Sequence, residues 1–313
     1  MKLNKPAFWD KKIGLISILL YPISLIYFGI ILLKKKITKE KIFKIPIVCV
    51  GNIYLGGTGK TPTSILLAKE LSKNGKKTAI LRKYYKSHKD EHNLIRDKFE
   101  NLILCKNRTL GLLDAERLNY DFVILDDGLQ DYQIKKNINI VCFNENQLIG
   151  NGLVLPSGPL REKLSSLKNK DVILINGKKN INFEEQILKI NNNLEIFYSS
   201  FEPINLDQFK SKKIIAVAGI GNPENFFQLL EKNDIFIEKK IIFPDHHELS
   251  KIEFEELISE ADKRNCQILM TEKDYYKIKE YGTNKIEYLK VSLKINNLNK
   301  LIKKIESLND QNL

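Results

Sequence analysis

Residues 47–61 read IVCVGNIYLGGTGKT, and they predict the centre of the fold. Its apolar start, Ile47 to Val50, follows Pro46 and stops at Gly51, which predicts a short buried strand of a parallel sheet. Its end places a glycine cluster and a lysine where a helix is expected to begin, from about Lys60 to Lys73. A strand, a glycine-rich turn and a helix in this order are typical of a loop that binds phosphate.

The chemistry of this loop depends on a few residue types. Glycines let backbone amides converge on phosphate oxygens, the lysine can reach the β- and γ-phosphates, and the threonine hydroxyl can bind Mg²⁺. Tyr54 replaces the first glycine of the usual pattern. The alternative, a glycine turn without a ligand, leaves Lys60 and the glycines unexplained. The predicted phosphate-binding residues are Gly56, Gly57, Thr58, Gly59, Lys60 and Thr61.

A second polar pair follows the apolar run that begins at Phe122 and ends in Asp126 and Asp127. A strand that ends in carboxylates beside a phosphate loop can deliver oxygen ligands to Mg²⁺. We expect one aspartate to bind the metal and the other to orient the metal or the acceptor. The alternative is a plain Asp-Gly turn, since Gly128 follows Asp127.

Strands and helices alternate along the rest of the chain, which predicts an α/β fold with a largely parallel sheet. A second, smaller α/β series begins after about Pro203, so two lobes are expected. The predicted organisation is an N-terminal helical segment at 1–45, a nucleotide-binding domain at 46–203 and a second lobe at 204–313. Further strands are expected at Thr78–Leu81, Leu102–Cys105, Phe122–Leu125, Ile138–Phe143, Val172–Ile175, Ile214–Ala218, Ile235–Ile242, Gln267–Met270 and Glu287–Val291.

The positive charge is concentrated at the N-terminus. The chain has 313 residues and a net charge of +13, and residues 1–45 hold ten lysines against two acidic residues, so they carry +8 of it. These lysines flank 21 uncharged residues, Ile13 to Leu33. Basic residues around an apolar stretch favour an anionic membrane surface over nucleic acid, for which no stacking or groove-reading motif is present.

The apolar stretch is long enough to cross a bilayer, but Pro22 interrupts it and lysines flank both ends. We expect a bent helix or helical hairpin that lies in the membrane interface and makes the protein peripheral or monotopic. The alternatives are a buried core helix and a single membrane span. No small-residue cleavage site follows, so a removed signal peptide is not expected.

The remaining composition predicts little further chemistry. The four cysteines, Cys49, Cys105, Cys142 and Cys266, are far apart and show no metal or redox pairing pattern, which indicates buried thiols in a reducing cytoplasm. Two loops carry polar residues: 155–162, which ends in Arg161 and Glu162, and 244–247, which contains His246. Each loop taken alone has a structural explanation.

Taken together, these strings resemble the tetraacyldisaccharide 4′-kinase family over nearly the whole chain. The matching residues include Phe8-Trp9, Gly51-Asn52 with the phosphate loop, Asp126-Asp127-Gly128-Leu129-Gln130, the loop 155–162, 218–223, Asp245-His246 and Thr271-Glu272-Lys273-Asp274. The resemblance implies a two-lobed P-loop kinase on the cytoplasmic face of the inner membrane. It further implies ATP and Mg²⁺ as cofactors and a lipid-linked disaccharide as substrate; no obligate protein partner is expected.

The resemblance also implies roles for single residues. Asp90 and His246 form the predicted dyad that activates the sugar hydroxyl, and Lys60 and Arg161 are expected to stabilise charge on the transferring phosphoryl group. Thr61, Asp126, Asp127 and Glu162 are the predicted metal ligands. The chain departs from the family pattern at Leu129 and Asp131, at Lys89 and His92 around Asp90, and in Leu81-Arg82-Lys83-Tyr84.

Two other function classes fit parts of this pattern. A membrane-bound P-loop ATPase or GTPase switch would need the phosphate loop but no acceptor, and a degenerate membrane scaffold would need neither catalysis nor turnover. The kinase hypothesis differs from both because it predicts a catalytic base, which Asp90 and His246 would supply.

Overall fold

A computed structural model describes residues 5–244, 247, 249–278, 281 and 285–310. The chain forms two compact units that are not contiguous in sequence. The large unit contains Lys5–Tyr84, Phe99–Ser200 and the chain from Leu293 onward, and the small unit contains Tyr85–Lys98 and Phe201–Ser292. These units cut across the sequence ranges 46–203 and 204–313, because 85–98 belongs to the small unit and the last helix to the large one.

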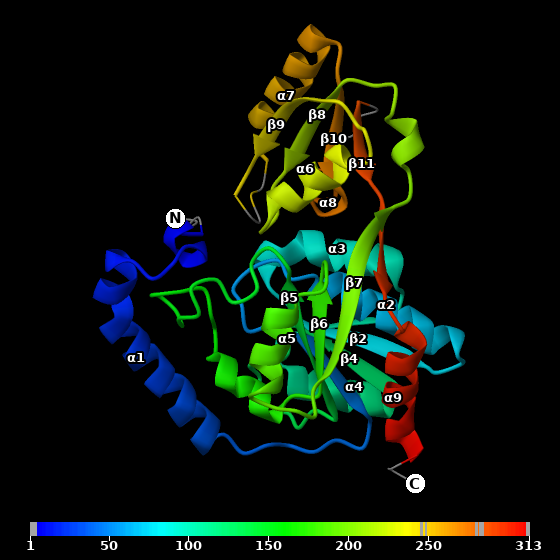
Figure 1. Ribbon diagram of the computed structural model, residues 1–313. Helices are drawn as coiled ribbons and strands as arrows, with labels where there is room; N and C mark the ends of the chain where they lie inside the picture. The colour runs from blue at the N-terminus through cyan, green and yellow to red at the C-terminus, as the bar shows by residue number, and fades with distance from the viewer. Residues whose placement is uncertain (1–4, 245–246, 248, 279–280, 282–284, 311–313) are drawn as a thin grey trace. The chain divides into compact units, whose positions relative to one another are not determined.

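The large unit is built on an eight-stranded sheet with the order β12-β7-β6-β5-β1-β4-β2-β3 (Figure 1). Within this order, each pair of neighbouring strands between β7 and β3 is parallel. The strands are β1 (Ile47–Gly51), β2 (Thr78–Lys83), β3 (Leu102–Cys105), β4 (Phe122–Asp126), β5 (Ile138–Asn144), β6 (Val172–Asn176), β7 (Glu195–Pro203) and β12 (Val291–Ile295).

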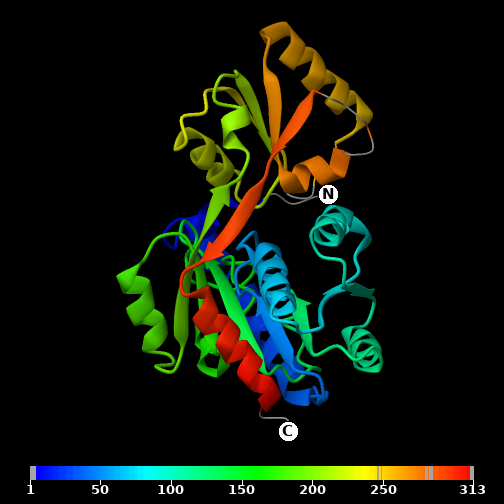
Figure 2. The ribbon, with the colours of Figure 1, turned by 90° about the vertical axis from the view of Figure 1, so that its right-hand side faces the viewer.

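Helices cover this sheet. The predicted helix after the phosphate loop is confirmed as α2, which packs on β1, β2 and β4, and α9 lies beside α2 (Figure 2). The helical elements are η1 (Ala7–Asp10), α1 (Leu15–Ile37), α2 (Lys60–Lys73), α4 (Arg108–Arg117), η3 (Leu164–Asn169), α5 (Ile181–Leu188) and α9 (Leu298–Asp310).

The small unit has a four-stranded parallel sheet with the order β11-β10-β8-β9. Side chains alternate across β8, so Ile214, Ala216 and Ala218 pack with α6, whereas Ile215 and Val217 pack with α7. The elements are η2 (Lys86–His88), α3 (Lys89–Lys98), η4 (Leu206–Gln208), β8 (Ile214–Ala218), α6 (Pro223–Glu231), β9 (Ile237–Ile242), α7 (Lys251–Arg264), β10 (Gln267–Thr271), α8 (Glu272–Ile278) and β11 (Ile286–Leu289).

The predicted α/β class and the parallel sheets are confirmed, with three corrections to the elements. The run predicted as one strand, Glu287–Val291, is divided between β11 and β12, which belong to different sheets. Strand β7 was not predicted. The strand predicted from Ile235 starts at Ile237, because the amide of Ile235 donates to the Leu230 carbonyl at the end of α6.

The N-terminal apolar stretch forms one continuous helix, α1, with Pro22 inside it, so a helical hairpin is not formed. Nor is α1 a buried core helix, because Leu15, Leu19 and Ile26 are 83%, 78% and 66% exposed. It is long and apolar enough to cross a membrane.

Candidate phosphate-transfer site

The phosphate loop lies between β1 and α2, at the edge of the sheet where the parallel strands end. Since β4 is the neighbour of β1 and β2 is the neighbour of β4, Asp126 at the end of β4 and Arg82 near the end of β2 meet beside the loop. The sheet order therefore assembles residues that are far apart in sequence.

Two asparagine side chains fix the shape of the loop. The amide of Asn52 donates to the Gly56 carbonyl at 3.1 Å and to the Thr58 hydroxyl at 3.0 Å, and the amide of Asn176 donates to the Thr58 carbonyl. Gly59 has φ +85°, and a Cβ built on it would lie 2.3 Å from Asn176 Nδ2. Glycine is thus required at position 59 both by the backbone conformation and by the space.

Asp126 is fully buried and is held by three side chains. The hydroxyl of Thr61 donates to one carboxylate oxygen at 3.2 Å, and Ser64, one turn further along α2, donates to the other at 3.0 Å. The guanidinium of Arg82 forms an ion pair with Asp126 and also donates to the Thr61 hydroxyl at 3.1 Å. Asp126 and Thr61, both predicted metal ligands, are therefore neighbours that share one cation.

Asp127 lies at the turn that follows, with φ 55°, and its carboxylate contacts two cations. Its Oδ1 lies 3.7 Å from Lys60 Nζ and 3.1 Å from Arg161 Nη1. Burial alone would raise the pKa of Asp127, but the charges of Lys60 and Arg161 hold that pKa well below its ordinary value. Burial lowers the pKa of Lys60, against the opposing effect of Asp127.

Glu162, another predicted metal ligand, is buried and has partners from two directions. Gln130 donates to its Oε1 at 3.0 Å and Lys35 of α1 lies 3.4 Å from its Oε2. Gln130 also accepts a hydrogen bond of 3.4 Å from Arg161. The large unit therefore brings together Lys60, Thr61, Asp126, Asp127, Arg161 and Glu162.

Asp90, one member of the predicted dyad, belongs to the small unit. Asp90 is buried in the first turn of α3, and Lys273 Nζ of α8 lies 4.0 Å from its Oδ2 and 3.1 Å from Glu91 Oε1. His246, its predicted partner, lies outside the described residues. The neighbouring His247 is bonded to Glu253 at 3.0 Å.

The matched string at 271–274 has a structural role in the small unit. Asp274 is buried in α8 and accepts bonds from the Thr271 hydroxyl at 2.6 Å and from the Gly219 amide at 2.7 Å. Lys277 bonds to Asp274 at 2.6 Å and to the Gly219 carbonyl at 3.0 Å. These contacts tie α8 to the strand end of β8.

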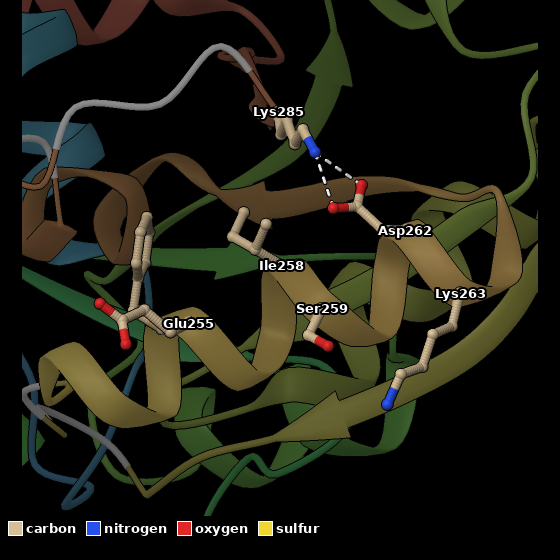
Figure 3. Close-up of a pocket in the computed structure, with 7 residues that line it drawn as sticks. Glu255, Ile258, Ser259, Asp262, Lys263 and Lys285 are labelled. Atoms are coloured by element: carbon tan, nitrogen blue, oxygen red, sulfur yellow. Dashed lines mark hydrogen bonds and ion pairs between the residues drawn. The ribbon is translucent and has the colours of Figure 1, made fainter.

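A hollow on the small unit lies along α7 (Figure 3). Lys285 bonds to both carboxylate oxygens of Asp262 there at 2.7 Å. None of the predicted site residues lines the hollow, so it has no place in the predicted chemistry. The lining residues are Phe254, Glu255, Ile258, Ser259, Asp262, Lys263 and Lys285.

Several residues of the phosphate-transfer site were not predicted from the sequence. Ser64, Asn176 and the partner role of Lys35 were not predicted, and Arg82 was noticed only as a departure from a family pattern. The available signal for Asn176 was a polar residue at the end of an apolar strand, Val172–Asn176. The sequence contains no comparable signal for Lys35.

The chain is similar to known proteins over nearly its whole length. The profile of the family described as Tetraacyldisaccharide-1-P 4′-kinase matches residues 16–309. A tetraacyldisaccharide 4′-kinase of Pelagibacter ubique is 41% identical over the full length of both chains. One from Francisella tularensis subsp. novicida is 33% identical over 92% of this chain and 98% of its own.

One solved structure has the same fold. The crystal structure of LpxK from Aquifex aeolicus in complex with ATP aligns with a TM-score of 0.72 and covers 93% of this chain and 99% of its own, at 24% identity.

Proposed function

The chain belongs to the tetraacyldisaccharide 4′-kinase family, and from this premise we propose how its residues carry out the reaction. The protein is a kinase that uses ATP to phosphorylate the 4′-hydroxyl of a tetraacyldisaccharide 1-phosphate in lipid A biosynthesis. The observation that carries this conclusion is the family match over 16–309.

The nucleotide phosphates fit the loop at 56–61. The space above Gly59 admits no side chain, and Asn52 and Asn176 hold the Gly56 and Thr58 carbonyls in place. Lys60 is the first residue of helix α2, so its charge would add to the partial positive charge of the helix amino terminus at a bound phosphate. Residues Gly56 to Thr61 would therefore bind the phosphates of ATP.

A magnesium ion fits the oxygen donors of Thr61, Asp126 and Asp127. Mg²⁺ is commonly held by one or two carboxylates together with phosphate oxygens, and no cluster of three His, Cys, Asp or Glu side chains suited to a metal occurs among the described residues. The ion would supply positive charge beside the transferring phosphoryl group. Glu162 stays a predicted ligand whose oxygens here accept from Gln130 and Lys35.

Lys60 and Arg161 would stabilise the negative charge that the phosphoryl group carries during transfer. Both cations contact the same oxygen of Asp127, at 3.7 and 3.1 Å, so both are directed at one small region next to the loop. Positioned charges of this kind supply most of the catalysis in phosphoryl transfer.

The acceptor hydroxyl must lose its proton as it attacks phosphorus, and Asp90 would accept that proton. In support of this role, Asp90 is a buried carboxylate whose Oδ2 lies 4.0 Å from Nζ of Lys273. His246 would orient Asp90.

The membrane proposal rests on the inverted pattern of α1. Its buried residues are two serines, Ser17 and Ser24, while most of its apolar residues are exposed. An apolar outer face next to Lys34, Lys35 and Lys36 suits a lipid surface with anionic headgroups. The helix would hold the kinase on the cytoplasmic face of the inner membrane.

The test is transfer of the γ-phosphate from labelled ATP, with Mg²⁺, to a tetraacylated glucosamine disaccharide 1-phosphate in detergent. The natural chain, Lys60→Ala and Lys69→Ala are compared, since Lys69 is an exposed lysine of the same helix. The expected result is label at the 4′-position that depends on Lys60 and not on Lys69. ATP hydrolysis without lipid labelling would favour the switch instead.

A further inference from the structure

Helix α1 has polar residues where a helix packed on a protein is usually apolar. Ser17 and Ser24 are both 0% exposed, whereas most of the apolar residues around them are exposed. Seven residues, or two helical turns, separate the two serines, so they lie on one face. Buried serines on one face indicate that this face makes hydrogen bonds to the rest of the protein.

Ser17 accepts a bond of 3.2 Å from the amide of Asn151, and the partner of Ser24 is the loop 153–162 that follows. The Ser24 hydroxyl lies 3.0 Å from the Val154 carbonyl and 2.8 Å from the Ser157 hydroxyl, and it accepts a bond of 3.0 Å from the Ser157 amide. The loop fits its surroundings closely, because a Cβ on Gly158 would lie 2.4 Å from the Leu153 carbonyl oxygen. Ser24 thus fixes a loop that has little freedom to adjust.

The same loop borders the phosphate-transfer site. The Arg161 amide donates to the Ile53 carbonyl at 2.6 Å, and the Leu55 amide donates to the Pro159 carbonyl at 2.8 Å, so the loop pairs with the chain that leads into the phosphate loop. Its side chain Arg161 contacts Asp127 at 3.1 Å. A shift of this loop would move a cation that acts on the phosphoryl group.

A second contact joins α1 to the site through charge. Lys35 Nζ lies 3.4 Å from Oε2 of Glu162, whose side chain is only 3% exposed. On its other side Glu162 accepts from Gln130, which bonds to Arg161. Lys35 itself is half-exposed. Its charge on α1 therefore neutralises the buried carboxylate of Glu162 from the outside.

We infer that Ser24 and Lys35 are positioning residues of the kinase, which set Arg161 and Glu162 relative to Asp127. This inference rests on the proposed function. Helix α1 then has a second role beside membrane attachment: it holds the loop that carries Arg161 and Glu162.

The experiment compares Lys35→Met with Lys36→Met in the full chain in detergent. Both changes remove one lysine charge from the same exposed end of α1. Of these two lysines, Lys35 is the one that is bonded to Glu162 in the described structure. Steady-state kinetics are measured for ATP and lipid, with melting temperature and binding to vesicles of anionic lipid as further readouts. Lys60→Ala is the reference for loss of the site.

The expected result is that Lys35→Met lowers kcat roughly 10-fold, because small displacements of catalytic groups are costly, while KM, melting and vesicle binding stay equal to those of Lys36→Met. Lys35→Arg should restore kcat. In a Glu162→Gln background, Lys35→Met should cause no further loss. Ser24→Ala should lower kcat in the same way.

Three outcomes overturn the inference. If Lys60→Ala abolishes transfer but Lys35→Met equals Lys36→Met, the inference fails and the proposed function stands. If Lys35→Met lowers kcat equally with and without Glu162, the contact is not the cause. If Lys60→Ala retains full transfer, the site assignment fails, and the inference fails with it.

Discussion

The guanidinium of Arg82 donates to the buried carboxylate of Asp126 from the neighbouring strand. The side chains are 6% and 0% exposed, so neither charge has substantial access to water. Arg82 also donates to the hydroxyl of Thr61, which like Asp126 is a predicted metal ligand. In this structure Arg82 therefore compensates the charge of the carboxylate that we assign to Mg²⁺.

Removing this arginine should destabilise the fold. Arg82→Met leaves the charge of Asp126 buried without its partner, which typically costs about 3–5 kcal/mol in unfolding free energy. The double variant Arg82→Met, Asp126→Asn should recover part of that loss. Urea denaturation of both variants checks this, with the exposed Arg117→Met as control. Equal stability of the single and double variants would contradict the explanation.

Gly59→Ala should impair nucleotide binding. Alanine in a left-handed conformation costs about 1–2 kcal/mol, and the new methyl group also displaces Asn176 from the Thr58 carbonyl. Gly75→Ala is the matched control, because φ at Gly75 is +78° but nothing lies within 4 Å of its Cβ. We expect ATP affinity to fall roughly 10-fold or more at Gly59 alone. Calorimetry measures it, and equal losses at the two glycines would refute the role of Asn176.

The affinity for ATP should fall at alkaline pH earlier than an ordinary lysine would allow. Burial lowers the pKa of Lys60, so the free protein loses this charge as pH rises through a pKa below the usual lysine range. The unfolded chain keeps this proton to a higher pH than the folded chain does. Between the two pKa values, the free energy of unfolding therefore rises with pH. Lys60→Arg should keep its affinity there. Identical alkaline profiles for the two proteins would exclude Lys60 as the titrating group.

Asp90→Asn should remove the general base without affecting nucleotide binding. Transfer to the lipid should fall roughly 100- to 10,000-fold, whereas ATP affinity should remain that of the natural chain. Glu91→Gln serves as control, because it removes a neighbouring carboxylate that also pairs with Lys273. Unchanged turnover in Asp90→Asn would exclude it as the base.

Charge on the outer face of α1 should weaken membrane binding. Ile26→Glu places a carboxylate among exposed apolar residues of α1, and the cost of inserting it into lipid should reduce vesicle binding at least roughly 10-fold. Leu110→Glu, an equally drastic change at an exposed position of α4, should have no effect. Co-sedimentation with vesicles is the measurement, and similar binding by both variants would argue against α1 as the anchor.

The sequence was sufficient to locate groups that are close together along the chain. The phosphate loop depends on adjacent residues, and Asp126 and Asp127 follow a strand that its apolar run predicts. Arg82 could not be assigned, because its contact with Asp126 depends on β2 lying next to β4, and sheet order is not encoded in any local pattern. For the same reason β12 was merged with β11, although a break at Lys290 sends them to different sheets.

The discontinuous units affect any attempt to study the nucleotide-binding half alone. Cutting the chain after Ser200 would remove α9, which packs against α2 and carries Glu306, a partner of Asn74 at 2.9 Å. Helix α2, which follows the phosphate loop, would then lose the helix that packs against it. A separable half requires two internal excisions, at 85–98 and 201–292, with the C-terminal segment rejoined, because the small unit is inserted into the large one at two places instead of being appended to it.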